Sequence, residues 1–500
     1  MESPIIHKKI SEKKPPYKGS AKRSHREGLV ARRKYFLICS DILILAITIV
    51  TGWGLAEILK NLFFPGLQAM EWDRAITQTP PLFGLPAVFI ILTSGFRGHY
   101  VRFRPFWDEF ADLFKIVSLA AGLVIIYLYL TKSHFSRFWF VITWSLVVFM
   151  VPISRMLAKK AMMRAGFWFT PTVVIGSGAN ALESAEAVES DPLLGMKVIA
   201  ILEPDAENTC FSSPYEQHCI GDQPEKILRN LGDPYVVLAL EPQDYDRHTK
   251  LLGRLCRSQV NMSIVPPLRG VSLLGSEVSH VFRHEVLLLR VRNNLARRSP
   301  QMLKRVFDLF AASVLLLILS PVFAVFTWRI SRDGGNVFFR HARVGRHGEP
   351  FACYKFRTMI PNAQEVLEET LASDEEARKE WDRDFKLKND LRITPVGKFL
   401  RKTSLDELPQ LWNVAKGEMS LVGPRPIVQE ELERYGDQVN FYLEARPGMT
   451  GLWQISGRNN TDYERRVSLD AWYARNWSLW YDVVILLKTV PVVLNRKGAY

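Results

Sequence analysis

The chain has 500 residues and a formal net charge of +14, and 48% of its residues are hydrophobic. The length suggests about three domains. No nucleic-acid motif accompanies the positive charge, and the basic residues cluster beside apolar segments, so the composition favours anionic lipid and phosphorylated substrates over nucleic acid. The five cysteines form no C-x-x-C pair and no Cys/His cluster with metal-ligand spacing, so we interpret them as reduced thiols.

Residues 1–34 are basic and polar, and we expect a disordered cytoplasmic tail. Residues 35–160 hold four apolar stretches, which predict a four-helix transmembrane bundle. The stretches are Tyr35–Leu59, Pro81–Gly95, Leu113–Thr131 and Phe138–Leu157. The first is too long for a cleaved signal peptide and should stay as an anchor. The second is marginal, because two prolines and a glycine interrupt it.

Basic residues are concentrated in the tail, in the second connection and after the fourth stretch. By the positive-inside rule, these three segments face the cytoplasm. We therefore expect both ends of the bundle, and everything after it, on the cytoplasmic side.

Residues 168–290 predict a small Rossmann-like α/β domain. A strand at 171–175 runs into a turn with Gly176 and Gly178, a helix follows, and a second strand at 197–202 ends at Glu203. Later strands are expected at 235–240 and 262–265. Gly176, Gly178 and Glu203 are a possible nucleotide site, because such a turn and acid bind phosphate and ribose in dinucleotide-binding units. A purely structural role, or a role in pairing subunits, stays open.

Residues 300–332 contain one long apolar stretch with Ser320-Pro321 near its middle. Proline removes a backbone donor and opens a helix, and serine can satisfy the freed carbonyl. Basic residues flank the stretch on both sides, so a crossing would place one basic flank outside. We expect a re-entrant helix-break-helix that enters and leaves by the same face; a spanning helix is the alternative.

The remaining residues, 333–500, are soluble in composition but rich in basic and aromatic side chains. Phe351–Thr358 predicts an exposed strand that presents cations, and Asn362–Asp384 a charged helix. The run Val483–Leu487 follows several Trp and Tyr residues and is too short to span. It predicts an amphipathic helix at the membrane interface, with a buried core helix as the alternative.

Two adjacent carboxylates, Asp406 and Glu407, follow Ser404 and precede an apolar run. This order predicts a helix with Ser404 as N-cap and both acids in its first turn, where the helix dipole favours an ionised carboxylate and a bound phosphate. An ionised aspartate beside a phosphate is a candidate nucleophile. The alternative is an ordinary capping box at a helix start.

Phosphoryl transfer needs a nucleophile, a divalent cation and cationic side chains around the phosphate. Asp406 is the predicted nucleophile. Glu407 suits Mg²⁺, which accepts one or two carboxylates together with phosphate oxygens and water. The predicted phosphate- or nucleotide-binding cations are Lys355, Arg357, Arg401, Arg425, Arg446 and Arg458. Arg425 lies between two prolines, so its guanidinium should be held for bidentate phosphate contact.

Several motifs in the last two-fifths of the chain carry a specific resemblance. They are KRVFD at 304–308, Ser320-Pro321, YKFRTM at 354–359, LDELPQ at 405–410, LVGPRP at 421–426 and RPGMTGLWQ at 446–454. Together they resemble the catalytic module of the monotopic phosphoglycosyl transferases, the bacterial sugar transferase family. The bundle and the α/β domain match its large members. The amino-acid sequence at 345–348, 385–390 and 470–473 is similar to that of the undecaprenyl-phosphate galactose phosphotransferases.

The resemblance implies a membrane protein of the α plus α/β class, with a transmembrane bundle, a Rossmann-like domain and a monotopic catalytic domain (333–500) carried by the re-entrant helix and interfacial helices. It implies that Asp406 attacks the sugar-linked phosphorus of a UDP-sugar, with UDP-galactose expected from the similarity to the galactose phosphotransferases, and expels UMP. Undecaprenyl phosphate then takes the phosphosugar from the aspartate. The implied setting is the bacterial cytoplasmic (inner) membrane, with Mg²⁺, at the first committed step of O-antigen, capsule or exopolysaccharide synthesis. A homodimer is expected.

Two alternatives belong to other classes. A membrane-anchored nucleotide-sugar dehydratase or epimerase would also carry a Gly-rich domain, but its chemistry uses Tyr with Lys four residues on, and no tyrosine here has lysine at that offset. A non-catalytic scaffold for polysaccharide assembly would leave the two acids as a mere helix start. Release of UMP from a UDP-sugar distinguishes the transferase from both.

Overall fold

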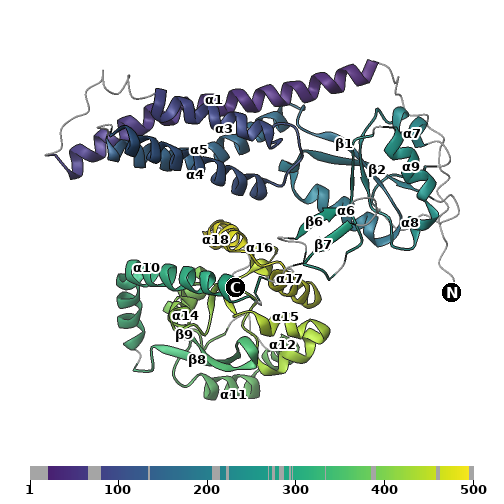
Figure 1. Ribbon diagram of the computed structural model, residues 1–500. Helices are drawn as coiled ribbons and strands as arrows, with labels where there is room; N and C mark the ends of the chain where they lie inside the picture. The colour runs from purple at the N-terminus through teal and green to yellow at the C-terminus, as the bar shows by residue number, and fades with distance from the viewer. Residues whose placement is uncertain are drawn as a thin grey trace, which may run out of the picture. The chain divides into compact units, whose positions relative to one another are not determined.

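The computed structural model describes residues 21–65, 80–132, 136–204, 214–220, 224–258, 260–268, 270–272, 276–280, 287–291, 294–295, 297–332, 334–384, 390–457 and 462–494 (Figure 1). The chain divides into two compact units, Met1–Leu268 and Arg269–Tyr500. The first unit holds the helical bundle and a parallel sheet, and the second holds the two acids at 406–407.

Four apolar helices lie side by side in the bundle (Figure 1). They are α1 (Ala21–Phe63), α3 (Leu85–Phe96) after the π-helical turn η1 (Pro80–Gly84), α4 (Phe106–Thr131) and α5 (Arg137–Arg164). By length and composition α1, α4 and α5 can each cross a membrane, and 80–96 is a shorter apolar segment. The four predicted stretches are therefore helices. The expectation of a disordered tail is wrong for residues 21–34, which belong to α1; residues 1–20 lie outside the described part.

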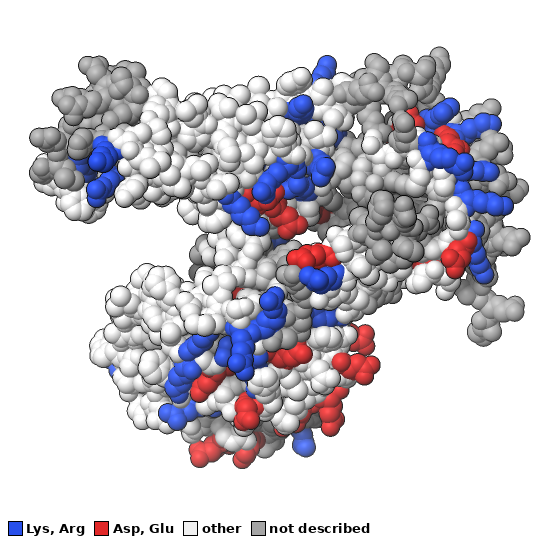
Figure 2. All heavy atoms as spheres, viewed as in Figure 1, with Lys and Arg blue, Asp and Glu red and all other residues white. Residues whose placement is uncertain are grey.

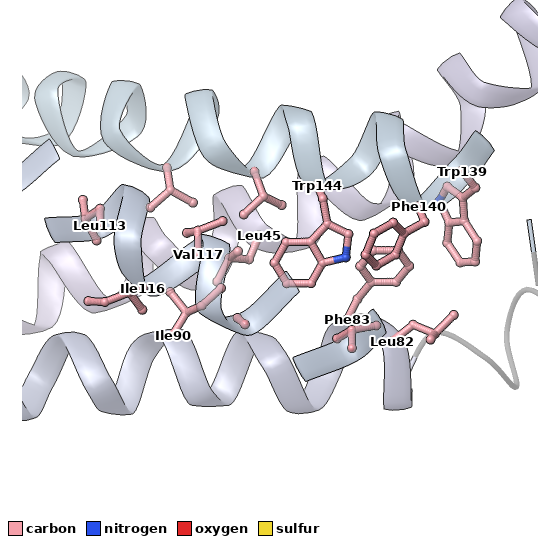
Figure 3. Close-up of a cluster of buried hydrophobic side chains, with 14 of the residues drawn as sticks. Leu45, Leu82, Phe83, Ile90, Leu113, Ile116, Val117, Trp139, Phe140 and Trp144 are labelled. Carbon is pink, nitrogen blue, oxygen red and sulfur yellow. The ribbon is translucent and has the colours of Figure 1, made fainter. Parts of the chain in front are cut away.

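Aliphatic and aromatic side chains together fill the inside of the bundle (Figure 3). The ring centroids of Phe83 and Trp139 lie 4.8 Å apart, and those of Phe83 and Trp144 lie 6.2 Å apart. The outward side chains are apolar too, since Val50 is 67% exposed and Leu85 is 70% exposed. Figure 2 shows the middle of the bundle free of charge on the viewed face. A helix group that is apolar inside and outside is typical of a membrane bundle.

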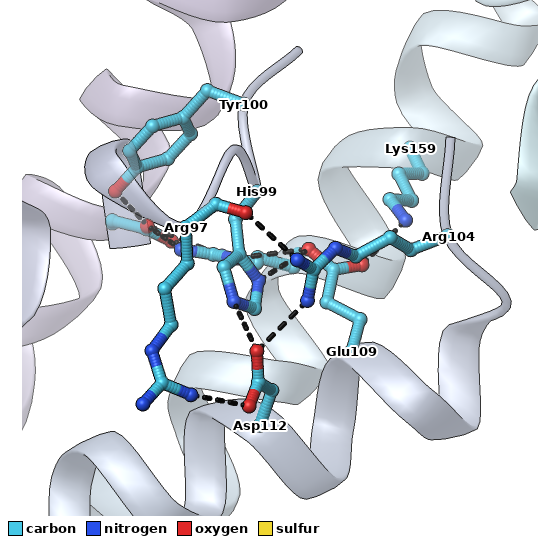
Figure 4. A network of polar contacts seen from close by, with 9 residues as sticks. Arg97, His99, Tyr100, Arg104, Glu109, Asp112 and Lys159 are labelled. Atoms are coloured by element: carbon cyan, nitrogen blue, oxygen red, sulfur yellow. Dashed lines mark hydrogen bonds and ion pairs between the residues drawn. The ribbon is translucent and has the colours of Figure 1, made fainter. Parts of the chain in front are cut away.

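Charged side chains are buried in the bundle next to its connection with the sheet (Figure 4). Arg155 donates to Asp41 Oδ2 at 2.5 Å and to Glu109 Oε1 at 2.9 Å, and Lys159 donates to Glu109 Oε2 at 2.6 Å. Two acids therefore face two bases. Because removal of one partner would leave a bare buried charge, this network fixes how α1, α4 and α5 align.

The rest of the first unit is a five-stranded parallel sheet in the order β3-β2-β1-β4-β5. Its strands are β1 (Thr170–Ile175), β2 (Met196–Glu203), β3 (Gln217–Cys219), β4 (Tyr235–Leu238) and β5 (Met262–Ile264). Its helices are α6 (Gly178–Ser190), η2 (Pro192–Leu194), α7 (Pro224–Asn230), α8 (Asp244–Arg247) and α9 (Thr249–Arg257). The strands predicted at 171–175, 197–202, 235–240 and 262–265 are found as β1, β2, β4 and β5 of a parallel sheet. The boundary differs, because the hairpin β6 (Glu277–His280) with β7 (Leu287–Arg290) belongs to the second unit.

The long helix α10 (Arg298–Ser331) of the second unit is apolar enough to cross a membrane, and its most apolar part is almost entirely unburied. Figure 1 shows α10 bent sharply between two straight halves. Pro321 lies inside it and cannot donate to the carbonyl of Leu317, four residues before. The Ser320 hydroxyl donates to that same Leu317 oxygen at 2.7 Å, as the Ser-Pro pair predicts. The re-entrant course itself stays a prediction.

The other elements of the second unit surround the acidic pair. They are β8 (Phe338–Val344), η3 (Arg346–Gly348), β9 (Pro350–Phe356), α11 (Ala363–Ser373), α12 (Glu375–Asp384), α13 (Pro395–Thr403), η4 (Leu405–Glu407), α14 (Gln410–Lys416), β10 (Ser420–Val422), η5 (Gln429–Gln438), α15 (Val439–Glu444), β11 (Gly448–Thr450), α16 (Leu452–Ile455), α17 (Tyr463–Arg475) and α18 (Leu479–Leu494). The predicted strand at 351–358 is β9, paired antiparallel with β8. The predicted helix at 362–384 is two helices, α11 and α12.

Helix α18 confirms the predicted helix around 483–487. It has features of both alternatives, the amphipathic interfacial helix and the buried core helix. Asp482, Val484 and Ile485 are buried, whereas Leu487 is 49% exposed and Val490 is 55% exposed. One face therefore packs on the unit and the other stays apolar and open. Its contact with a membrane interface stays a prediction.

Candidate active site

Asp406 and Glu407 lie in the short 3₁₀ turn η4 between α13 and α14. The predicted N-cap is wrong. Ser404 takes a left-handed φ of +56°, its backbone N–H donates to Arg401 O at 3.2 Å, and its side chain caps nothing. Ser404 therefore ends α13, and Pro409 begins α14 after the turn. Because α13 ends just before η4 and α14 begins just after it, both carboxylates lie on one short turn between two helices.

Lys355 of β9 faces this turn. Its Nζ lies 2.7 Å from Glu407 Oε1, and both side chains are about one-third exposed. Burial lowers the pKa of Lys355, but the Glu407 and Asp406 carboxylates outweigh it and raise that pKa above its ordinary value. Lys355 is therefore a positive charge beside both acids, and its contact with a phosphate stays a prediction.

Burial raises the pKa of Asp406 to about 6, and the neighbouring Glu407 charge adds to the rise, while Lys355 and Arg401 oppose it. At pH 7 a group with that pKa is about nine-tenths ionised. The carboxylate is thus charged at neutral pH but less well solvated than a surface aspartate. A nucleophile with little water around it is favourable for attack on phosphorus.

Arg401 belongs to the last turn of α13 and is held on the side of Asp406. Its Nε donates to Thr358 Oγ1 at 2.9 Å. Burial lowers the pKa of Arg401, and the charges of Asp406 and Asp390 raise it. Arg401 therefore lies close enough to Asp406 to act on its charge, and its contact with a phosphate stays a prediction.

A buried asparagine that the sequence analysis missed joins β9 to α14. Asn413 Oδ1 accepts from the backbone N–H of Tyr354 at 3.0 Å, and its Nδ2 donates to Ala352 O at 2.7 Å. These bonds fix the strand that carries Lys355 against the helix that follows Glu407. A polar residue at a helical core position was the only signal, and its partners lie about 60 residues away in the chain.

The loop with Arg425 follows β10. Gly423 has no room for a side chain, because a Cβ there would lie 2.3 Å from Arg446 O. The Arg425 backbone N–H donates to Asp470 Oδ2 at 3.4 Å, and Tyr435 OH donates to the same oxygen at 3.0 Å. Burial raises the pKa of Asp470 to about 7. Asp470 thus fixes the backbone of the loop that carries Arg425.

The Arg425 guanidinium lies over the ring of Trp453 at 5.4 Å, and that of Arg466 lies over the same ring at 4.8 Å. Burial lowers the pKa of Arg466, and the charge of Arg425 lowers it further. Two like charges on one aromatic ring favour an anion between them. Arg466 is a substrate-contact candidate that the sequence analysis missed, because nothing in the spacing separates it from its exposed neighbour Arg465.

Three other predicted cations have different outcomes. Arg357 donates to the backbone oxygens of Asn336, Met359 and Ile330 at 2.7–3.1 Å, so its guanidinium fastens the end of α10 and we withdraw it as a phosphate ligand. Arg446 lies among other arginines near α10, apart from Lys355 and Arg401. Arg458 lies outside the described residues.

The acidic turn offers few metal ligands. Within the described residues, no group of three or more His, Cys, Asp or Glu side chains could hold a metal ion. An all-protein cage therefore does not fit. Asp406 and Glu407 do fit Mg²⁺ bound mainly by phosphate oxygens and water, because that ion needs only one or two carboxylates from the protein. Glu407 would hold it after leaving its ion pair with Lys355.

In the α/β domain, a carboxylate of the chain itself occupies the start of α6, where an anion could otherwise bind. Glu241 Oε1 accepts from the backbone N–H of Asn180 at 2.9 Å, at the start of α6, where a nucleotide phosphate would bind. A Cβ on Gly178 would meet that carboxylate at 3.2 Å, and one on Gly176 would meet Ala239 O at 2.1 Å. Both glycines are thus explained by packing. Glu203 is buried, and its Oε1 has no hydrogen-bond partner within the described residues.

Two family models match the chain: bacterial sugar transferase at residues 299–496 and CoA-binding domain at residues 96–266. With Glu241 in place, the residues at α6 do not fit the phosphates of coenzyme A. The chain is 47% identical to the undecaprenyl-phosphate galactose phosphotransferase of Salmonella typhimurium, over 80% of this chain and 84% of that protein. It is 46% identical to the UDP-galactose-lipid carrier transferase of Erwinia amylovora, with shares of 80% and 84%. It is 29% identical to the UDP-glucose:undecaprenyl-phosphate glucose-1-phosphate transferase of Klebsiella pneumoniae, with shares of 73% and 76%.

Proposed function

This chain belongs to the bacterial sugar transferase family, and we propose that it transfers a sugar 1-phosphate from a UDP-sugar to undecaprenyl phosphate at the cytoplasmic face of a bacterial inner membrane. The products are undecaprenyl-diphosphate-sugar and UMP. The observation that carries the proposal is the turn η4, where Asp406 lies next to Glu407, Lys355 Nζ lies 2.7 Å from Glu407 Oε1, and the charges of Lys355 and Arg401 both act on Asp406.

The proposed reaction has two displacements. An Asp406 oxygen attacks the sugar-linked phosphorus, and the bond from that phosphorus to the oxygen shared with UMP breaks, so UMP leaves with the electron pair. A phosphate oxygen of undecaprenyl phosphate then attacks the same phosphorus, and the bond to Asp406 breaks. The second step returns the carboxylate and leaves the diphosphate on the lipid.

Each nearby residue has a role in these steps. Lys355 and Arg401 balance the charge on the phosphoryl oxygens as UMP leaves, and Arg425 binds the substrate's phosphates from its rigid loop. Bound Mg²⁺, held by Glu407, would screen the phosphate oxygens. Partial burial keeps water from Asp406, so that the aspartyl phosphate meets the lipid before it meets water.

We propose galactose as the sugar. The support is similarity: the two relatives at 47% and 46% identity carry galactose in their names, whereas the glucose-1-phosphate transferase is 29% identical. A place at the start of O-antigen, capsule or exopolysaccharide synthesis is also part of the proposal. Pairing of two chains as a homodimer remains part of the proposal, and light scattering of the purified protein tests it.

The test is release of UMP from UDP-galactose by the detergent-solubilised chain with Mg²⁺ and undecaprenyl phosphate. Asp406→Asn should abolish release, whereas Asp437→Asn, an exposed aspartate of the same unit, should leave it unchanged. Mass spectrometry of protein quenched during turnover should find a hexose phosphate on Asp406. UDP as the product would indicate a conventional glycosyltransferase, and no nucleotide at all would indicate a scaffold. A panel of UDP-sugars tests galactose.

A further inference from the structure

Three arginines lie near the N-terminal end of α10, just before the apolar stretch of that helix begins. Arg346 of η3 donates from Nη1 to Gln301 Oε1 of α10 at 3.4 Å, and Arg305 lies one turn further along the same helix. Arg446 follows α15, which packs against η3. The charges of Arg346 and Arg305 lower the pKa of Arg446, after the larger effect of burial. The three guanidiniums are therefore close neighbours.

The acids around this cluster do not neutralise it. Asp308 is the acid that acts on Arg446, but its Oδ2 accepts from Ser420 Oγ at 2.8 Å and its Oδ1 from the Leu421 N–H at 3.2 Å. Glu444 acts on Arg346. The three bases thus face two acids, of which Asp308 is already bonded to β10, and like charges held together favour an anion among them.

Two of the three arginines have unused donors. Within the described residues, Arg446 makes no side-chain hydrogen bond or ion pair, and the buried Nε of Arg346 has no partner. Arg305 differs, because it donates to Val414 O at 2.6 Å and to Ala415 O at 2.7 Å and so also closes the end of α14. Arg446 and Arg346 are therefore the side chains that remain available to a ligand.

The surroundings indicate which anion. Next to Arg305 on α10, Met302 is 71% exposed, Val306 is 56% exposed and Phe310 is 70% exposed. Figure 2 shows basic side chains gathered beside a broad uncharged surface on the second unit. Arginines at the polar end of an apolar helix lie at headgroup depth when that helix enters a bilayer. An anion bound there with an alkyl chain beside it is a lipid phosphate.

This place is separate from the acidic turn. The charged groups that act on Asp406 are Glu407, Lys355 and Arg401, and none of the three arginines is among them. It is nevertheless joined to the Arg425 loop, because the Gly448 N–H, two residues after Arg446, donates to Pro424 O at 2.8 Å. A lipid headgroup bound at Arg446 would thus lie against the loop that binds the substrate's phosphates.

We propose that Arg446 and Arg346, backed by Arg305, bind the phosphate headgroup of a lipid at the polar end of α10. Two lipids have this chemistry: the acceptor undecaprenyl phosphate, which rests on the proposed function, and an anionic phospholipid of the surrounding membrane, which does not. The site holds the headgroup at the membrane surface beside the catalytic unit.

The experiment measures lipid binding without turnover. Native mass spectrometry of the full detergent-solubilised chain, with no UDP-sugar present, is titrated with undecaprenyl phosphate, phosphatidylglycerol and phosphatidylcholine. Arg446→Gln and Arg346→Gln should weaken binding of one anionic lipid about tenfold, which corresponds to about 1.4 kcal/mol. Arg465→Gln, which removes an exposed arginine of the same unit, should bind like the wild type. Melting temperatures identify any variant that is misfolded.

The outcomes of this experiment distinguish between the two lipids, and they distinguish the proposed lipid site from the proposed function. A loss confined to undecaprenyl phosphate assigns the site to the acceptor, and KM for that lipid should rise while KM for UDP-galactose stays unchanged. A loss confined to phosphatidylglycerol assigns it to the membrane. Wild-type affinity for both lipids in well-folded Arg446→Gln and Arg346→Gln would overturn the site while leaving UMP release, and so the proposed function, untouched.

Discussion

Lys304→Met should destabilise the second unit more than any single surface change. Lys304 Nζ donates to Asp482 Oδ2 at 2.7 Å, and Asp482 also accepts from Trp477 Nε1 at 2.9 Å and from Tyr473 OH at 2.7 Å. Asp482 is 0% exposed and Lys304 is 4% exposed. The substitution removes the only cation bonded to this carboxylate within the described residues, and such a loss costs about 3–5 kcal/mol.

The effect can be followed as a melting temperature. For a unit of 150–250 residues, 1 kcal/mol shifts the Tm by about 2–4 °C, so the expected fall is about 6–20 °C. Trp477 contacts Asp482 directly, so intrinsic fluorescence is a suitable probe. Lys379→Met is the matched control: its ion pair with Glu375 spans 2.9 Å but lies on the surface, and we expect no measurable change.

The loss of Tm in Lys304→Met should depend on pH, and the pKa of Asp482 gives the direction of that dependence. Burial raises the pKa of Asp482, and Lys304 is the largest influence that lowers it, so in Lys304→Met this pKa rises further. A carboxyl with a folded-state pKa above its unfolded value stabilises the folded state when protonated, and this contribution is lost as the pH rises through the folded pKa. The Tm deficit should therefore be small at pH 5 and grow towards pH 8.

A second substitution tests the cause. Lys304→Met combined with Asp482→Asn should recover part of the lost stability, because no bare charge is then buried. The reasoning fails if Lys304→Met melts within 2 °C of the wild type at pH 8, or if its deficit is the same at pH 5 and pH 8.

Arg466→Gln should raise KM for UDP-galactose about tenfold, because this guanidinium lies on Trp453, whereas Arg465→Gln should not; steady-state kinetics decide. Coenzyme A and NAD should leave the Tm of the wild type unchanged, because Glu241 occupies the start of α6, and calorimetric binding of either at micromolar concentration would contradict this. In intact cells, Ser331→Cys at the end of α10 should resist a membrane-impermeant maleimide and react after permeabilisation; labelling from outside would mean that α10 spans the membrane.

The sequence was sufficient wherever the signal was local. Apolar length predicted the bundle helices, a strand, turn, helix and strand in succession predicted the sheet, and Ser320-Pro321 predicted that the serine would satisfy a freed carbonyl, which is that of Leu317. The predicted break in α10 is a bend within one continuous helix (Figure 1). Ser404 was misassigned because serine before an acidic turn is typical of an N-cap, whereas here it ends α13 with a left-handed φ, a position that usually holds Gly or Asn.

Distant contacts were beyond prediction. Asn413 bonds to a strand about 60 residues earlier, and Lys304 bonds to Asp482 across 178 residues, so no spacing rule could pair them. Arg357 shows the reverse error: a cation inside a family motif was assigned to substrate, although its guanidinium holds backbone carbonyls at the end of α10. Residue type identified a cation, and only the fold showed which partner it has.

The buried contacts of α10 connect the apolar helix to catalysis. Asp308 accepts from Ser420 and Leu421 of β10, and Lys304 donates to Val422 O of the same strand at 3.1 Å. The Arg425 loop begins at the next residue after β10. Because both buried side chains lose their partners if α10 shifts, the position of α10 is coupled to the position of that loop. If α10 lies in the membrane as proposed, its depth there would also set the height of the Arg425 loop, and a lipid phosphate would approach the active site along α10.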